Sequence, residues 1–188
     1  MSKELWVILA DGFEEIEALT PVDCLRRAGA VVKVLSLGAP LVTGARGIVV
    51  KADDTLVNCV SKDDEKSPLP DGIILPGGLG GAKALAASSL VGEVLREQDA
   101  AGGLVAAICA APALVLASRG LLEGRRWTCY PGMEEGIAAG SWSADRVVVD
   151  GRLVTARGPG CAMEFSLALV EVLYGEGPRA RLAEALVL

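Results

Sequence analysis

The chain has 188 residues, of which 52% are hydrophobic and 22% charged, and its formal net charge at pH 7 is −6. This length and balance are typical of one globular domain with a sizeable core, and they exclude a disordered chain. Because the charge is negative and lysine and arginine form no stripe, we expect neither nucleic acid nor an anionic membrane among the partners.

The cysteines and the missing histidine restrict the chemistry further. Five cysteines occur at wide, irregular spacing without a Cys-x-x-Cys pair, and there is no histidine. We therefore expect no metal site. Four of the cysteines are interpreted as reduced, buried thiols, and this use of cysteine predicts a cytoplasmic protein.

Two apolar stretches could be mistaken for targeting or membrane segments. The run at Leu5–Ala10 is too short for a signal peptide and has no cleavage site. The uncharged stretch Ala100–Ser118 is nominally long enough to span a bilayer, but it is rich in alanine and glycine and contains Pro112. A buried strand followed by a buried helix explains it better, with the proline in the first helical turn.

Short β-branched runs alternate with helical patterns, which predicts a parallel sheet with helices on both faces. In chain order we expect a strand at Leu5–Ala10, a helix at Glu14–Arg27, a strand at Val31–Leu37, a hairpin around Leu41–Lys51, a strand at Gly72–Leu75, helices at Ala82–Ala87 and Leu90–Ala100, a strand at Leu104–Ile108, a helix at Pro112–Ser118, strands at Arg146–Val149 and Arg152–Thr155, and helices at Cys161–Leu173 and Arg179–Leu186. The hairpin should turn near Gly44–Gly47 and the late strand pair through Asp150–Gly151.

Ser61–Pro70 is interpreted as a solvated loop. Without repeats or a linker, residues 1–188 are expected to form a single doubly wound α/β domain.

Ligands of open α/β sheets bind at the carboxyl ends of the strands, and the first loop there carries a cluster of acids. Glu14 and Glu15 suit the first turn of a helix, where acidic residues offset the dipole, so we interpret them as structural. Glu17 falls in line with Pro21 and Cys24 on an apolar stripe and should point inward. A buried carboxyl without a cationic partner is driven toward its protonated form. A helix-edge acid that merely reaches solvent remains an equal alternative.

The second loop, Pro76–Gly81, is rich in glycine and follows a buried strand. Glycines at this position let the backbone approach a ligand and aim N–H groups at an anion. The run lacks the spacing of a dinucleotide or phosphate-binding loop. A flexible tight turn and an oxyanion-type donor site remain as the two interpretations.

The third loop contains Cys109, which lies between the strand Leu104–Ile108 and a helix starting at Ala110 or Ala111. A thiol at a helix N-terminus meets unpaired N–H groups, which favour the thiolate. The small residues on either side of Cys109 are similar to those of a nucleophile elbow. A buried structural cysteine is the alternative, but the strand-to-helix position favours a functional one.

These segments together resemble the ThiJ/PfpI superfamily, and in particular its parkinsonism-associated protein deglycase branch. The matching segments are Asp11–Glu17, Leu75–Gly78, Ala106–Pro112 and Thr155–Gly160. They occur in the family's order, and the resemblance extends from Leu5 to about Tyr174. It implies a flavodoxin-like fold and a homodimer.

The resemblance also assigns roles to residues of this chain. Cys109 would be the nucleophile on a strained elbow, and Glu17 the protonated carboxyl that hydrogen-bonds its sulfur and shuttles protons. The N–H groups of Gly78 and Ala110 would form the oxyanion site, with Gly77 shaping the turn. The segment Arg157–Gly160, which includes Pro159, and an arginine such as Arg46 would lie near the dimer interface and support the pocket.

One position departs from the family. Many members carry a histidine where this chain has Tyr130. A phenol is a poor base near neutral pH, so peptidase or amidase activity that depends on a Cys–His pair is not expected.

The resulting hypothesis is a cofactor-independent glyoxalase or deglycase. Its substrates would be 2-oxoaldehydes such as methylglyoxal and glyoxal, or their protein and nucleotide adducts, handled through a Cys109 hemithioacetal with Glu17 as proton shuttle. The alternative is a non-enzymatic redox sensor or redox-regulated chaperone that works through oxidation of Cys109 to the sulfinate. A scaffold with a vestigial pocket is a third possibility.

Overall fold

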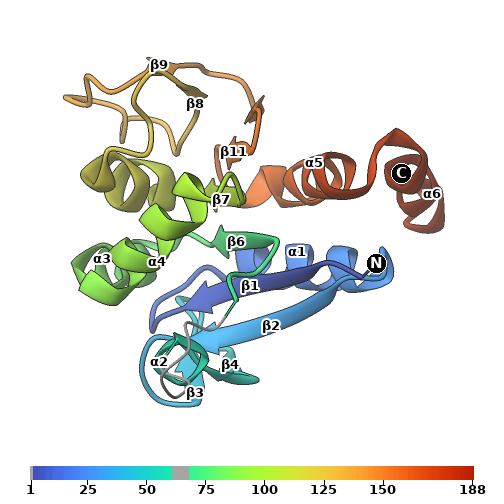
Figure 1. Cartoon of the computed structure of the whole chain (residues 1–188), viewed down its shortest axis with the longest axis horizontal. Coiled ribbons are helices and arrows are strands. Elements are labelled where there is room, and N and C mark those ends of the chain that lie inside the picture. Colours follow the sequence, from blue (N-terminus) through green and yellow to red (C-terminus); the bar gives the residue numbers. More distant parts are fainter. Residues whose placement is uncertain (1, 61–67) are drawn as a thin grey trace.

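The computed structural model describes residues 2–60 and 68–188. Within them, a seven-stranded sheet runs through the molecule in the order β10-β11-β7-β6-β1-β2-β5 (Figure 1). All neighbouring strands are parallel except β10 and β11. The strands are β1 (Glu4–Leu9), β2 (Val31–Ser36), β5 (Asp54–Thr55), β6 (Gly72–Leu75), β7 (Leu104–Ile108), β10 (Val147–Asp150) and β11 (Leu153–Ala156).

Helices cover both faces of this sheet, which confirms the doubly wound, flavodoxin-like α/β fold. The α-helices are α1 (Glu15–Arg27), α2 (Leu56–Val60), α3 (Leu79–Ala87), α4 (Ser89–Ala100), α5 (Ala162–Tyr174) and α6 (Glu176–Ala185). A π-helix, η1 (Pro112–Leu116), and the 3₁₀ turns η2 (Ala117–Arg119) and η3 (Pro159–Cys161) complete the helical segments.

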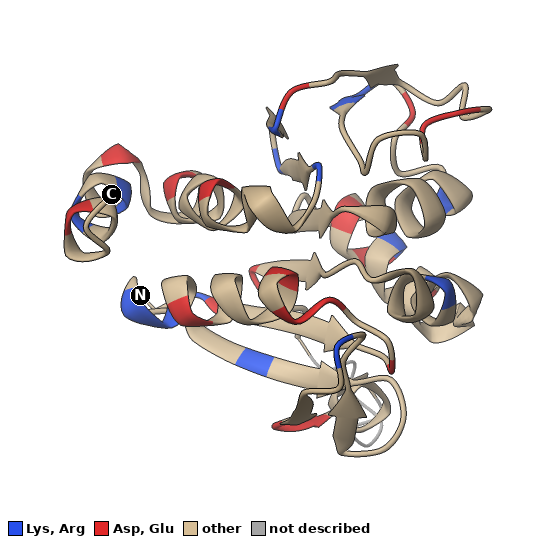
Figure 2. Cartoon of the chain, turned by 180° about the vertical axis from the view of Figure 1, so that it is seen from behind, with Lys and Arg blue, Asp and Glu red and all other residues tan. Residues whose placement is uncertain are grey.

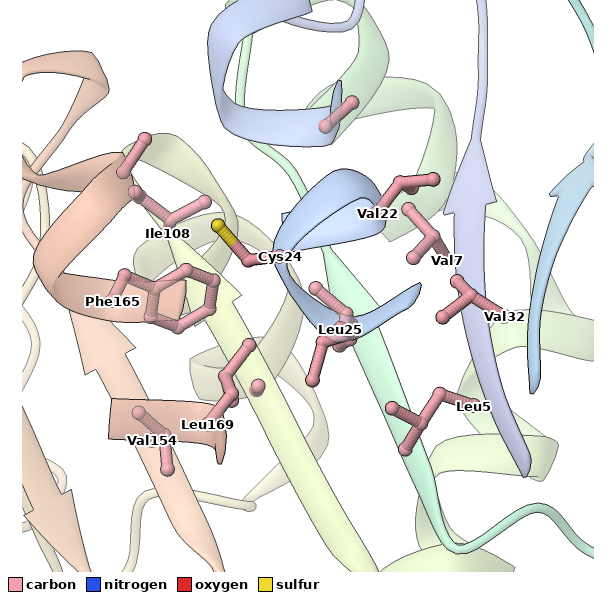
Figure 3. Close-up of a cluster of buried hydrophobic side chains, with 14 of the residues drawn as sticks. Leu5, Val7, Val22, Cys24, Leu25, Val32, Ile108, Val154, Phe165 and Leu169 are labelled. Atoms are coloured by element: carbon pink, nitrogen blue, oxygen red, sulfur yellow. The ribbon is translucent and has the colours of Figure 1, made fainter. Parts of the chain in front are cut away.

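Alternating side chains of the strands build two hydrophobic cores. In β1, Leu5 and Val7 face the core shared with α1 and α5, whereas Trp6 and Ile8 face the core shared with α3, α4 and η1. Figure 3 shows the first core, in which Cys24 of α1 points toward Phe165 of α5. Because successive side chains of a strand point to opposite faces, a central strand covered on both faces is apolar throughout.

Two short ladders lie outside the main sheet. The hairpin of β3 (Leu41–Thr43) and β4 (Val49–Lys51) confirms the prediction, since it closes through residues 44–47 with Gly47 at φ 86°. The second ladder pairs β8 (Arg126–Trp127) with β9 (Ser141–Trp142). Neither β8, β9, β5 nor α2 was predicted, because strands of two residues and a one-turn helix are too short to show a periodic pattern.

The helix after Cys109 differs from the expected regular helix over Pro112–Ser118. It begins at Ala110, passes into η1 at Pro112 and tightens into η2. The Ala117 N–H donates to the Pro112 carbonyl, the wide spacing of a π-helix. The Ser118 hydroxyl donates to the carbonyls of Leu114 and Val115, which competes with regular α-helical bonding.

Other element boundaries shift by a few residues. Helix α3 begins at Leu79 rather than Ala82, because Gly78 adopts φ 80° and its carbonyl accepts the Ala82 N–H at 2.8 Å. Helix α6 begins at Glu176 rather than Arg179. The late strand pair is antiparallel as expected, but it turns through residues 151–152 instead of Asp150–Gly151.

The described residues also bear on the membrane and surface predictions. None of their helices is long and apolar enough to cross a bilayer, and Ala100–Ser118 divides into the end of α4, β7 and the helical turns after it. Acidic and basic residues are interspersed along the chain (Figure 2). Most of the predicted solvated loop, residues 61–67 of Ser61–Pro70, lies outside the described residues.

Candidate active site

The carboxyl ends of β1, β6 and β7 bring the three predicted loops together. In strand order, β2-β1-β6-β7-β11 is the flavodoxin-type arrangement, in which ligands bind beside the first strand. A pocket of about 600 Å³ opens there. It is lined by Glu14, Glu17, Arg46, Gly78, Leu79, Cys109, Ala110, Tyr130, Pro131, Gly132, Met133 and Pro159.

Cys109 occupies a strained elbow between β7 and the following helix. Its φ is 65°, the left-handed region that a non-glycine residue seldom adopts. Its amide donates to the Ala156 carbonyl at 2.8 Å, and its own carbonyl accepts the Tyr130 N–H at 2.8 Å. These two bonds hold the elbow from neighbouring segments, so the sulfur faces the pocket in one defined direction.

Two backbone N–H groups point at the sulfur of Cys109. They belong to Gly78 and Ala110, and both lower the pKa of the thiol. Ala110 supplies its N–H because it is the first residue of the helix, where amides lack an intrahelical acceptor. These are the two donors predicted for the oxyanion site.

Glu17 lies beside the thiol with its side chain fully buried, so the interpretation as a solvent-reaching acid is wrong. Its Oε2 accepts the Gly77 N–H at 2.8 Å, while Oε1 has no hydrogen-bond partner within the described part of the chain. Burial raises the pKa of Glu17 from 4.5 to about 7, against the lowering effect of the Cys109 thiol and the Gly77 amide. The carboxyl can therefore hold a proton near neutral pH.

The thiol itself differs from the sequence-based expectation. Burial raises the pKa of Cys109 from 9.0 to about 12, and an ionised Glu17 adds to the rise. The amides of Gly78 and Ala110 act in the predicted direction but do not outweigh these effects. A thiolate is therefore favoured only when Glu17 carries the proton, and the two groups titrate as a pair.

The glycine loop packs closely against the nucleophile and the carboxyl, which favours its interpretation as a donor site. A Cβ on Gly77 would lie 2.6 Å from both the Cβ of Cys109 and Oε2 of Glu17. Gly78 has φ 80°, and a side chain there would collide with the backbone of residues 12–14. Only glycine lets this loop pack directly between the nucleophile and the carboxyl.

Glu15 lies in the first turn of α1 and has a structural role, as interpreted, whereas Glu14 also lies at the pocket. Glu14 precedes α1 as the N-cap without a side-chain cap bond, and it lines the pocket. Glu15 is buried, and its Oε1 accepts the N–H groups of Arg46 at 2.7 Å and Ile48 at 3.4 Å. It thereby docks the β3–β4 turn against α1 and places Arg46 at the pocket.

Glu15 and Glu17 differ in ionisation although both are buried on one helix. Burial raises the pKa of Glu15, but backbone N–H groups of Glu15 itself, Arg46 and Ile48 outweigh it and the net shift is downward. Glu17 receives one amide bond and is shifted upward. The stronger desolvation of Glu17 and the additional amide donors at Glu15 together move their pKa values in opposite directions.

The remaining predicted residues divide between two hollows. Tyr130 and Pro159 line the pocket, as expected. Arg157 does not: it lies in an adjoining hollow of about 210 Å³ with Arg146, and its guanidinium donates to the Ala144 carbonyl at 3.1 Å. The family motif gives the position of Arg157 along the chain, but it does not predict the direction in which the side chain extends.

Some pocket residues escaped the sequence analysis. Leu79, Pro131, Gly132 and Met133 line the site but were not singled out. The Pro131–Gly132 dipeptide was an available signal, because such pairs mark tight turns. As for metals, no group of three or more histidine, cysteine or acidic side chains gathers within residues 2–60 and 68–188.

Comparison with known proteins assigns the family. The model of the DJ-1/PfpI family matches residues 3–172. The chain therefore belongs to the DJ-1/PfpI family, within its DJ-1 branch.

Individual relatives agree along almost the whole length. The chain is 44% identical to Protein dj-1beta of Drosophila melanogaster over 191 residues, covering 100% of this chain and 98% of the relative. It is 37% identical over 164 residues to the Caenorhabditis elegans protein named glutathione-independent glyoxalase DJR-1.2, covering 86% and 83% of the two chains. The solved structure of oxidized Toxoplasma gondii DJ-1 matches with a TM-score of 0.91 and 37% identity, covering 99% and 98%.

Proposed function

We propose that this protein is a cofactor-independent glyoxalase or deglycase that converts 2-oxoaldehydes, free or as adducts, into 2-hydroxy acids. The observation that carries the proposal is the arrangement at Cys109. Its sulfur lies under the N–H groups of Gly78 and Ala110 and against the buried carboxyl of Glu17. A family relative is named a glutathione-independent glyoxalase, which supports an enzyme of this general kind.

In the first step, ionised Glu17 accepts the thiol proton as the sulfur attacks the aldehyde carbon. A carbon–sulfur bond forms, and the carbonyl electron pair moves to oxygen. The Gly78 and Ala110 amides stabilise this oxyanion, and Glu17 returns its proton to give the hemithioacetal. Above about pH 7 the pair holds one proton, so the carboxylate of Glu17 is free to accept it as the sulfur attacks.

In the second step, Glu17 moves the proton that rearranges the adduct. It removes the hydrogen of the former aldehyde carbon as a proton and delivers it to the neighbouring carbon. The hydroxyl proton of the hemithioacetal passes to the ketone oxygen, so the neighbouring carbon becomes a secondary alcohol. The product is a thioester, and water cleaves it to the 2-hydroxy acid and the free thiol. The overall reaction adds one water and needs no external oxidant or reductant.

Peptide hydrolysis is not part of the proposal. A Cys–His pair cannot form, because the chain has no histidine. Tyr130, at the corresponding place, has half of its surface exposed and contributes a backbone N–H to the elbow.

The direct test is lactate formation from methylglyoxal by the wild type, Cys109→Ser and Glu17→Gln. Both substitutions should abolish turnover, provided that circular dichroism shows intact folding. Lactate formation by folded Cys109→Ser would overturn the scheme.

The pH dependence offers an independent test of the acid–base pair. Below about pH 7 both groups are protonated, and above it the pair has lost one proton. We expect kcat/KM to rise with pH through an apparent pKa near 7 and to remain level into the alkaline range. A profile that falls through this region would contradict the role of Glu17.

A second function, redox sensing at the same cysteine, is favoured by one observation. Of the five cysteines, four are buried and Cys109 is half-buried. Peroxide can reach this sulfur first and oxidise it through the sulfenic to the sulfinic acid, one peroxide being reduced to water at each step. Intact mass and peptide mapping after mild peroxide should show two added oxygens on Cys109, whereas oxidation spread over several cysteines would exclude selective sensing.

We also propose a cytoplasmic homodimer. Ile16 and Leu19 of α1 and Ile48 and Val49 beside the Arg46 turn are exposed apolar side chains on adjoining elements. Such a patch is typical of an interface between copies. Sedimentation equilibrium should give twice the chain mass, and Leu19→Glu should shift it toward the monomer.

A further inference from the structure

The pocket is larger than its reacting groups require. Its volume of about 600 Å³ falls in the range of roughly 300–1,000 Å³ that accommodates drug-sized ligands. Methylglyoxal, with three carbons, would occupy only the end beside Cys109. The remaining space must be filled by water or by a larger substituent on the second carbonyl.

An apolar wall, formed by Leu79, Tyr130 and Met133, lines this remaining space. Leu79 follows Gly78, whose amide contacts the sulfur, and Tyr130 is bonded through its N–H to the Cys109 carbonyl at 2.8 Å. Leu79 and Tyr130 are 55% and 49% exposed. A ligand that covers them gains the free energy of removing apolar surface from water.

The apolar wall is preformed by local geometry. Tyr130, Pro131, Gly132 and Met133 make a tight turn in which the Met133 N–H donates to the Tyr130 carbonyl at 3.0 Å. Gly132 has φ 87°, and proline precedes it, which is the signature of a type II turn. Gly158 leaves room for the Tyr130 ring, since a Cβ there would already contact it at 3.4 Å. Ordering the wall therefore requires little additional loss of entropy on binding.

The charges of the pocket give no net attraction to a charged substituent. Glu14 and Arg46 both line it, with opposite signs, and Glu17 is committed to the thiol. A substituent of either sign would meet a like charge as well as an opposite one and would lose hydration. A neutral substituent loses no hydration of a charge, so the apolar wall decides its binding.

We infer that the preferred substrates are 2-oxoaldehydes whose ketone carries a neutral, apolar substituent of about four carbons or more, packed against Leu79, Tyr130 and Met133. This inference rests on the proposed glyoxalase function. The aldehyde end is held by Cys109 and the two amides, and the substituent extends along the apolar wall.

The test compares methylglyoxal with 4-methyl-2-oxopentanal, because both are aliphatic 2-oxoaldehydes. We expect kcat/KM to be about tenfold or more higher for the larger aldehyde, since burying additional methylene groups in a pocket gives discrimination of this order. Leu79→Ala, Met133→Ala and their combination should lower this ratio, with the combination bringing it close to one. Val149→Ala is the matched control, since Val149 is an exposed residue of β10 outside the pocket, and it should leave the ratio unchanged.

Product inhibition tests binding without relying on the variants. The apolar product 2-hydroxy-4-methylpentanoate should inhibit at a concentration several-fold below that of lactate. Turnover of both aldehydes with equal kcat/KM, or a ratio that survives the double substitution, would overturn this inference while leaving the proposed function intact. Turnover of neither aldehyde would overturn both.

Discussion

Thiols lie beside carboxylates at several places among the described residues, and two of these pairs, one of which forms the candidate active site, invite a comparison. Cys109 lies beside Glu17, and Cys129 lies with its Sγ 3.9 Å from Oε2 of Glu134. In both, burial raises the pKa of the thiol to about 12, and the neighbouring carboxylate adds to the rise. The chemistry of the pair is therefore similar at the two places.

The surroundings of the pairs differ. Cys129 is fully buried, and its Sγ contacts the Tyr130 carbonyl, an acceptor, at 3.4 Å. Cys109 is half-buried on a left-handed elbow, opens into the pocket and receives two amide N–H groups. The contrast teaches that a cysteine beside a carboxylate is insufficient; access for a substrate and donors for the developing oxyanion distinguish the site.

The largest expected effect comes from removing each thiol in turn. Cys109→Ser should lower the rate of lactate formation by on the order of a thousandfold or more, because it removes the nucleophile. Cys129→Ala should change it by less than about fivefold, since no substrate can reach that sulfur. A comparable loss of activity in folded Cys129→Ala would contradict the conclusion that only the Cys109 pair is catalytic.

The ionisation of Glu17 provides the next test, measured as stability. Its folded pKa of about 7 exceeds the ordinary 4.5, so the folded state holds a proton that the unfolded state loses in this interval. Stability should fall as pH rises from about 4.5 to 7, and Glu17→Gln should recover up to about 3 kcal/mol at pH 8. Urea unfolding at pH 4 and pH 8 measures this difference.

Glu134→Gln serves as the matched variant for that measurement. Glu134 is only half-buried, so its replacement should change the free energy of unfolding less. Equal gains from the two substitutions would show that the burial of Glu17 is not the deciding difference between the pairs.

A smaller effect is expected at Glu15, which does not belong to the Cys109–Glu17 pair but places Arg46 at the same pocket. Glu15→Gln weakens the bonds to the Arg46 and Ile48 amides and should lower the free energy of unfolding by about 1 kcal/mol. Because the folded pKa of Glu15 is lowered, this contribution is present above about pH 4.5 and is lost as pH falls through the folded pKa. KM for methylglyoxal should rise a few-fold as Arg46 shifts.

Asp23→Asn is the control for Glu15 on the same helix. Asp23 is exposed and pairs with Arg27 at 2.7 Å, and such a solvent-exposed ion pair contributes little to stability. If Asp23→Asn changed KM as much as Glu15→Gln, the positioning of Arg46 by Glu15 would be disproved.

Local patterns in the amino-acid sequence determined much of this protein by themselves. The apolar runs of β1, β6 and β7 are continuous because these strands are covered on both faces, and their order with the helices defines the doubly wound sheet. Helical spacing indicated the inward position of Glu17, with a solvent-reaching acid as the equal alternative that the structure then excluded. The small residues around Cys109 indicated the elbow, because a tight strand-to-helix turn excludes bulky neighbours.

Only the tertiary structure decided how these residues act together. Burial within the assembled fold raises the pKa of Glu17. Amides of residues 46 and 48, which come from another part of the chain, lower the pKa of Glu15. The same holds for Cys109 and Cys129: both are cysteines near acids, and long-range packing alone opens a pocket at one and closes the other. Electrostatics and access are properties of the assembled fold, because they depend on distance through space rather than along the chain.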